Sequence, residues 1–101
     1  VLRIEGGVED FARWKQTFDA DPAGRERSGV RRYRVSRAGD DPNYVTIDLE
    51  FDSRREAESL LARLRENVWS GKADGSTWDP QARVVETVDS KELRAKGPSL
   101  I

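Results

Sequence analysis

The stretch DDPNYVTIDLEFDS, from Asp40 to Ser53, combines a turn, an alternating strand and the start of a helix. Every second residue of its central part is apolar, namely Val45, Ile47, Leu49 and Phe51. The intervening residues are mostly polar, namely Tyr44, Thr46, Asp48 and Glu50. Because successive side chains of a strand point to opposite faces, this alternation predicts a strand with one buried face and one polar face.

The rest of the chain supplies further strands and helices around this one. Apolar residues that recur at three- and four-residue steps predict the helices. Ser53 and Glu56 fit a capping box at the start of the second helix. Gly6-Gly7 is expected to end the first strand, and 23–28 to form a short helical turn. We expect strands over 1–5, 30–37, 44–51 and 82–88, and helices over 8–20 and 53–69.

The resulting order β-α-β-β-α-β is typical of an α+β protein of the ferredoxin-like class. Such a fold has a four-stranded antiparallel sheet with both helices on one face. Residues 1–89 are expected to form this domain, and 90–101, with Gly97-Pro98, a C-terminal tail. The helices cover one face of the sheet, so the polar residues of the strands remain on the other.

Composition excludes several classes of function. The net charge is −1, so no overall positive field attracts nucleic acid or an anionic membrane. The chain has no cysteine and no histidine, which removes thiolate chemistry, the commonest zinc ligand and a proximal histidine for haem. We therefore expect no metal and no cofactor. No apolar run reaches membrane-spanning length and no signal-peptide pattern is present, so a cytoplasmic location is expected.

Charge is divided sharply between the second and third strands. Residues 25–37 contain six arginines and one glutamate, and 38–52 contain five acids and no base. If Val35 pairs with Val45, Arg32 faces Asp48 and Arg34 faces Thr46 on the polar side. Such cross-strand pairs fix the register of a hairpin. The polar face is then either a solvated surface with ion pairs or the wall of a pocket beneath a second subunit.

Nucleic-acid binding is a further function found on this topology, in RNA-recognition motifs. Those domains need aromatic and basic residues on the outer strand face. Here Thr46, Asp48 and Glu50 occupy the equivalent strand, and the two carboxylates would repel phosphate. We therefore expect no nucleic-acid partner.

Several short runs resemble small bacterial proteins of the dimeric α/β-barrel superfamily, over about residues 1–89. The resemblance is to a largely uncharacterised subset related to the antibiotic-biosynthesis monooxygenases. The runs are Val8-Glu9-Asp10-Phe11, Trp14-Lys15, Phe18-Asp19, Arg25, Gly29-Val30, Asp41-Pro42-Asn43-Tyr44-Val45, Phe51-Asp52-Ser53 and Glu56-Ala57. These motifs are structural, so they bear on the fold more than on the activity.

The resemblance implies a homodimer in which two sheets pack face to face into a barrel with space for a ligand. The superfamily includes cofactor-free oxygenases, haem-degrading oxygenases, isomerases, small cyclases and members without enzymatic activity. The haem branches and some isomerases use a histidine, which this chain lacks. The expected function is binding or transformation of a small, partly apolar molecule without metal or haem. A non-catalytic dimeric interaction protein is the alternative, and whether the chain is an enzyme stays open.

Four residues of the polar face are candidates for binding or proton transfer. Arg32 or Arg34 would hold an anionic or enolate oxygen, since arginine offers a fixed fork of donors. Tyr44 or Asp48 would handle the proton. For Asp48, pairing with the arginines is the simpler interpretation.

Three further residues are candidates for the wall of a ligand pocket. Cofactor-free oxygenation in the superfamily is associated with Asn, Trp and Tyr, and these types are supplied here by Asn43, Tyr44, Trp14, Trp69 and Trp78, without a motif that assigns them a catalytic role. Each also has a structural interpretation. Asn43 follows Pro42 and suits a turn, and Trp69 and Trp78 suit lids or subunit contacts.

Overall fold

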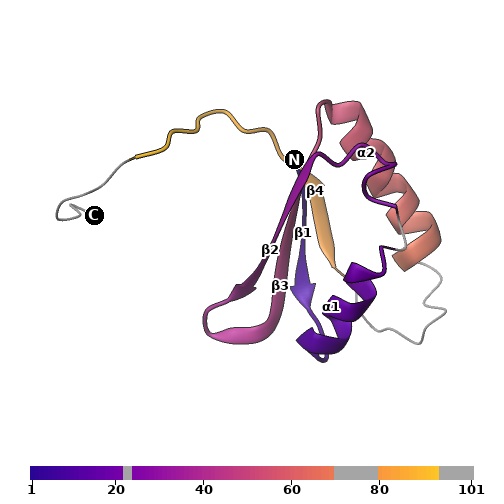
Figure 1. Ribbon diagram of the computed structural model, residues 1–101, viewed down its shortest axis with the longest axis vertical. Coiled ribbons are helices and arrows are strands. Elements are labelled where there is room, and N and C mark those ends of the chain that lie inside the picture. The colour runs from indigo at the N-terminus through magenta and orange to yellow at the C-terminus, as the bar shows by residue number, and fades with distance from the viewer. Residues whose placement is uncertain (22–23, 70–79, 94–101) are drawn as a thin grey trace.

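The computed structural model describes residues 1–21, 24–69 and 80–93, with only the backbone described for 67–69 (Figure 1). The chain is an α+β protein, as its sequence predicts. Its elements are β1 (Leu2–Gly7), α1 (Phe11–Asp19), β2 (Arg32–Ala38), β3 (Asp41–Glu50), α2 (Arg54–Arg63), the π-helical turn η1 (Leu64–Trp69) and β4 (Gln81–Val84).

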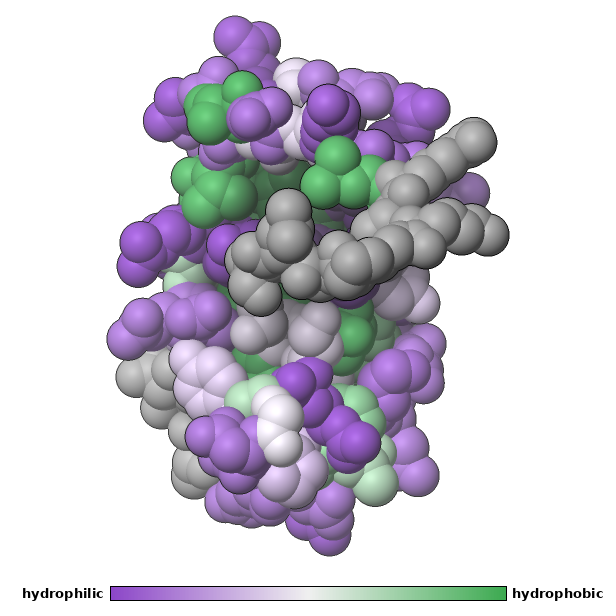
Figure 2. Space-filling view, turned by 90° about the vertical axis from the view of Figure 1, so that its left-hand side faces the viewer, coloured by the Kyte–Doolittle hydropathy of each residue, from purple (hydrophilic) through white to green (hydrophobic). Residues whose placement is uncertain are grey.

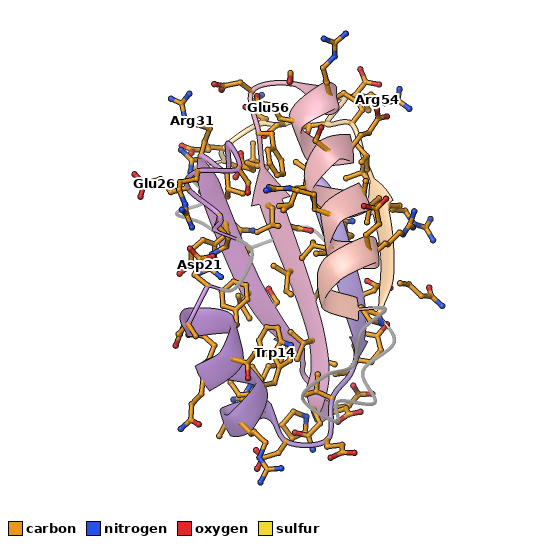
Figure 3. All side chains as sticks on the ribbon, turned by 90° about the vertical axis from the view of Figure 1, so that its right-hand side faces the viewer. Trp14, Asp21, Glu26, Arg31, Arg54 and Glu56 are labelled. Carbon is orange, nitrogen blue, oxygen red and sulfur yellow. The ribbon has the colours of Figure 1, made fainter. Side chains whose placement is uncertain are left out.

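The strands form one antiparallel sheet in the order β2-β3-β1-β4. Both helices lie on the same face of this sheet (Figures 1 and 3). Helix α2 packs over β1 and β4, and α1 packs over β3. This arrangement is compatible with the ferredoxin-like fold and leaves the opposite face of the sheet uncovered by helices.

The core lies between the central strands and α2. The sheet contributes Leu2, Ile4, Val45, Ile47 and Leu49, and α2 with its π-helical extension contributes Ala57, Leu60, Leu61 and Leu64. In β3 the buried residues alternate with half-buried polar ones, which confirms the period of two in the sequence. Removing these apolar side chains from water stabilises the fold by about 25 cal/mol per Å².

Helix α1 is attached differently, because none of its residues is fully buried. Its stripe of Phe11, Trp14 and Phe18 is half-buried, with Trp14 between the helix and the strands (Figure 3). The Trp14 and Phe18 rings stack with centroids 5.3 Å apart. The guanidinium of Arg25 lies 3.9 Å from the Phe18 ring centroid and 4.9 Å from that of Tyr33. An aromatic and cation–π layer therefore holds α1 to β2.

The beginning of the chain differs from its prediction. Strand β1 continues through Gly6 and Gly7, which pair with Val45 and Tyr44 of β3. The long neighbouring strand offers backbone partners that outweigh the weak strand propensity of glycine. Helix α1 begins only at Phe11, because Asp10 is its N-cap and accepts from the Ala12 N–H at 3.0 Å.

The expected hairpin register is also wrong. Strand β3 starts at Asp41, so a turn at 39–40 joins the strands and brings Arg37 opposite Val45. Arg32 is consequently opposite Glu50, and Arg34 opposite Asp48. The error is two residues, which keeps every side chain on its predicted face. Hydrophobic alternation cannot detect a shift of two residues, because its own period is two.

The second helix starts where the sequence predicts, after Ser53, but it is not an α-helix along its whole predicted length. The Ser53 hydroxyl accepts from the Glu56 N–H at 3.2 Å and donates to the Glu56 carboxylate at 3.2 Å. The α-helix ends at Arg63, and the backbone continues as a π-helix to Trp69. Residues 24–29, expected to include helix, form hydrogen-bonded turns, with Ser28 N donating to the Gly24 and Arg25 carbonyls.

Strand β4 is shorter than the predicted 82–88. It spans Gln81–Val84. Two further hydrogen bonds join Val85 to Val1: the Val85 N–H donates to the Val1 carbonyl at 2.7 Å, and the N-terminal amine donates to the Val85 carbonyl at 3.1 Å. Residues 86–93 then leave the sheet (Figure 1). The predicted strand also included Val88, which pairs with none of the described strands and is 89% exposed.

Gly29→Ala tests the turn that leads into β2. Gly29 has a φ of 96°, and a Cβ there would collide with the Glu56 carboxylate. We expect the substitution to lower the free energy of unfolding by about 1–3 kcal/mol, measured by urea denaturation. Gly39→Ala is the control, because nothing lies within 4 Å of its Cβ position. Equal stabilities of the two variants would contradict the strained geometry at Gly29.

Candidate functional site

The face of the sheet opposite the helices, here called the open face, carries polar side chains from every strand. Seen from the side toward which this face points, the surface is predominantly hydrophilic with separate apolar patches (Figure 2). Its residues are Arg3 and Glu5 of β1, Arg32, Arg34 and Ser36 of β2, Tyr44, Thr46, Asp48 and Glu50 of β3, and Gln81 and Arg83 of β4.

The strongest polar contact on the open face joins Arg3 to Asp48. Arg3 Nε donates to Asp48 Oδ1 at 2.8 Å, and Nη2 donates to Oδ2 at 3.1 Å. This fork raises the pKa of Arg3, first through the hydrogen bond and then through the charge of Asp48. The expected Arg32–Asp48 pair is therefore wrong, because Asp48 is held from the other side by β1.

The two candidate arginines of β2 are exposed. Arg32 Nη1 lies 3.7 Å from Glu50 Oε2, and its side chain is 77% exposed. Arg34 lies opposite Asp48, whose carboxylate is already bound in a fork by Arg3. Their positive charge lies along the β2 edge of the open face and is shielded there by solvent.

Tyr44 lies on the open face as predicted, with Glu5 as its partner. Its hydroxyl donates to Glu5 Oε1 at 3.3 Å. Desolvation, followed by the charge of Glu5 and this hydrogen bond, raises the pKa of Tyr44 above its ordinary value. The phenol therefore keeps its proton at neutral pH, which suits a hydrogen-bond donor and disfavours a general base.

Asn43 lies on the other side of the sheet from Tyr44. Its Oδ1 accepts from the Phe11 N–H at 3.0 Å, and its backbone oxygen accepts from the Val8 N–H at 2.7 Å. The side chain thus fixes the loop that leads into α1. The side chain of Trp69 and the whole of Trp78 lie outside the described residues, so the structure does not place them.

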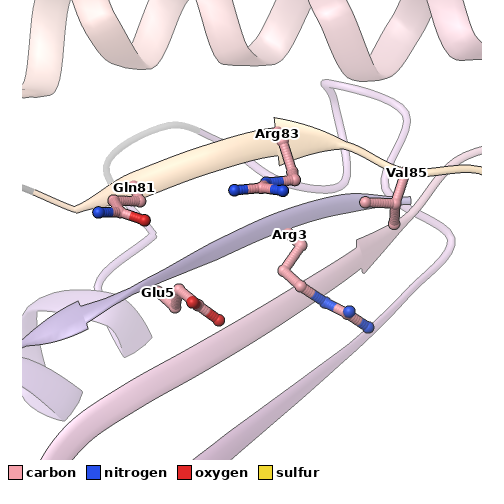
Figure 4. Close-up of a pocket in the computed structure, with 5 residues that line it drawn as sticks. All are labelled: Arg3, Glu5, Gln81, Arg83 and Val85. Atoms are coloured by element: carbon pink, nitrogen blue, oxygen red, sulfur yellow. The ribbon is translucent and has the colours of Figure 1, made fainter.

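A hollow of ≈ 260 Å³ lies on the open face over β1 and β4, here called the β1–β4 hollow. Figure 4 shows its lining side chains, with Arg3 extending over β3. They are Arg3, Glu5, Gln81, Arg83 and Val85. None of these five residues was predicted as a site residue. The signal that was missed is the alternation with Leu2, Ile4, Ala82 and Val84 on the buried side.

The hollow has a cationic end and an acidic end. Arg3 and Arg83 are direct cross-strand partners, and so are Glu5 and Gln81. Like charges placed directly opposite one another destabilise a sheet. Asp48 of β3 balances the charge of Arg3. The guanidinium of Arg83 lies on the other side of Arg3, in β4. The two ends are separated by two residues along the strands, which corresponds to about 7 Å.

No group of three or more acidic, histidine or cysteine residues in the described part is placed to hold a metal ion. None of the described helices is long and apolar enough to cross a membrane. No protein-family model matches the chain, and no curated protein and no solved structure matches it at a significant level.

Titration of Tyr44 tests the electrostatics of the site. The sequence has two tyrosines, so a Tyr33→Phe background leaves Tyr44 as the titrating phenol. We expect tyrosinate absorbance to develop at a pH above the ordinary tyrosine pKa of 10.0. Glu5→Gln should move the pKa of Tyr44 back toward that ordinary value. The folded state holds this proton more tightly than the unfolded state. Stability from Tyr44 is therefore complete below the ordinary pKa and is lost as pH rises through the folded pKa.

The control for this titration is Glu50→Gln, which removes a carboxylate from the same strand face without touching Tyr44. Its tyrosinate curve should match that of the Tyr33→Phe background. If Glu5→Gln and Glu50→Gln gave the same curve as the background, the contact between Glu5 and Tyr44 would be absent in solution.

Proposed function

We propose that the chain acts as a homodimer that binds a small, partly apolar molecule on its open face. In this proposal two copies pack their open faces together, as in the dimeric α/β-barrel superfamily that the sequence resembles. The bound molecule carries an anionic group. Any transformation would be of the oxygenase, isomerase or cyclase kind that such proteins perform without metal or haem.

The observation that carries this proposal is the hollow on an otherwise uncovered sheet face. Within the part of the chain that the structure describes, both helices lie on one side of the four-stranded sheet and no helix or strand covers the other side. Ligand sites are concave, and a few polar groups on their walls fix the orientation of the ligand. The β1–β4 hollow has this form, and a second copy above it would close it from solvent.

The electrostatics of the hollow support an anionic ligand. A carboxylate or enolate oxygen near Arg83 would receive a charge-assisted hydrogen bond and would offset the repulsion between Arg83 and Arg3. Val85 supplies an apolar contact at the same end. Glu5 and the phenol of Tyr44, whose proton is donated to Glu5, lie toward the other end, where they favour a neutral or hydrogen-bond-donating part of the ligand.

A non-catalytic interaction protein is the second candidate, and the ion pairs of the open face favour it. Arg3 with Asp48, and Arg32 with Glu50, already satisfy one another's charges. Exposed pairs of this kind contribute about 1 kcal/mol or less to stability. In this alternative the two ion pairs serve mainly to align the sheet with that of a second copy. The hollow would then hold water and no ligand.

Binding of simple aromatic acids distinguishes the two candidates. We expect benzoate, titrated into the isotopically labelled protein, to shift the backbone NMR signals of Arg3, Glu5 and Arg83 to saturation, and benzamide to shift them less. Arg83→Gln should weaken benzoate binding by at least about tenfold, since a hydrogen bond to a charged group contributes about 1.5–3 kcal/mol.

Arg32→Gln is the matched control, because this arginine is on the same face but outside the hollow. It should leave the benzoate titration unchanged. Absence of saturable shifts, or equal losses in the two variants, would contradict a ligand site at Arg83 and favour the non-catalytic candidate.

A further inference from the structure

Residues 86–93, here called the arm, form an extended segment that projects from the body of the protein. The arm leaves the sheet after Val85 and runs toward the side of the open face, away from the helices (Figure 1). Its apolar side chains are left in solvent, with Val88 89% and Leu93 75% exposed. An extended segment with exposed apolar residues has the form of a strand without a neighbour.

We propose that the arm of one copy adds as a fifth strand to the outer edge of β2 in a second copy. Strand addition of this kind uses backbone hydrogen bonds for affinity and side-chain contacts for specificity. It goes beyond the function proposed above, because burial of the open face in a dimer does not require any contact of the arm.

The lengths of the two edges favour β2 over β4. Strand β2 is one edge of the sheet and presents seven residues, whereas β4 at the other edge presents four. The longer edge offers more backbone groups to an added strand. Along an edge strand about half of the backbone N–H and C=O groups point away from the sheet, and these are the groups that an added strand would bond.

Charge also favours β2. The arm contains Glu86, Asp89 and Glu92 against Lys91, a sum of −2. Residues 31–38 contain four arginines and no acid, whereas β4 contains a single arginine. Part of the β2 charge is met by Asp52 and Glu50, but Asp48, the residue opposite Arg34, is bound by Arg3. An acidic segment along β2 would supply the remaining counter-charge.

The arm cannot reach the β2 edge of its own sheet without reversing its course. It starts from β4, and three strand spacings, about 14 Å, separate β4 from β2. It also points off the sheet on the side where a copy packed on the open face would lie (Figure 1). A second copy is therefore the occupant, and a two-fold axis would let each arm bind the other copy in a closed dimer.

Disulfide trapping between single-cysteine chains tests this proposal, since the native sequence has no cysteine. A chain carrying Val88→Cys in the arm is mixed with a differently tagged chain carrying Ser36→Cys in β2, under mild oxidation. We expect the mixed disulfide to form at least about threefold more than the mixed disulfide between Val88→Cys and Ser59→Cys, a control on the exposed side of α2.

A charge exchange makes the test specific. Asp89→Arg in the arm chain should lower the yield of the mixed disulfide with Ser36→Cys, and Arg34→Asp in the other chain should restore it. Equal trapping at positions 36 and 59 would overturn the proposal. That result in a protein that light scattering shows to be a dimer would leave the open-face dimer standing, so the two ideas fail separately.

Discussion

Packing of the apolar face of β3 against α2 is the interaction on which the rest of the structure depends. Val45, Ile47 and Leu49 are buried there, and β3 is also the strand to which both β1 and β2 are hydrogen-bonded. Its alternation fixes which side of every neighbouring strand faces the helices. Once that side is chosen, Arg3, Tyr44 and the other polar residues have no alternative but the open face.

The two helices contribute unequally, and this inequality shapes the molecule. Helix α2 buries Ala57, Leu60 and Leu61, whereas α1 buries none of its residues completely. A chain of 101 residues has a modest core even when both helices are well packed. The layer of Phe11, Trp14, Phe18 and Arg25 compensates through ring and guanidinium contacts. Association with a second copy would add buried area that the single chain lacks.

The sequence predicted the elements and their faces better than their pairing. The alternation from Val45 to Leu49 and the Ser53 cap are local signals, and the structure confirms them. The hairpin register depends on which residues form the turn. The turn is at 39–40, but the neighbouring Asp41, Pro42 and Asn43 are also turn-forming residues. The extension of β1 through Gly6 and Gly7 depends on a partner 39 positions away, Val45 for Gly6, which no local propensity reports.

The candidate site shows the same division. Tyr44 and Asp48 were assigned to the correct face, but their partners, Glu5 and Arg3, come from β1 and follow from strand order. The hollow with Arg83 is formed by β1 and β4, the two strands that are farthest apart in the sequence. Such a site needs the sheet order before it can be recognised, and alternation alone reveals only which residues are available for it.

The central claim is that a second copy covers the open face, and the molar mass in solution tests it most directly. Sedimentation equilibrium at micromolar concentrations should give twice the 11.5 kDa of one chain. Thr46→Trp, between Glu5 and Ser36 at the centre of the open face, should return the mass to that of one chain. Ser59→Trp on the exposed side of α2 should not. A single-chain mass for the unmodified protein, or a dimer that Thr46→Trp leaves intact, would contradict the account.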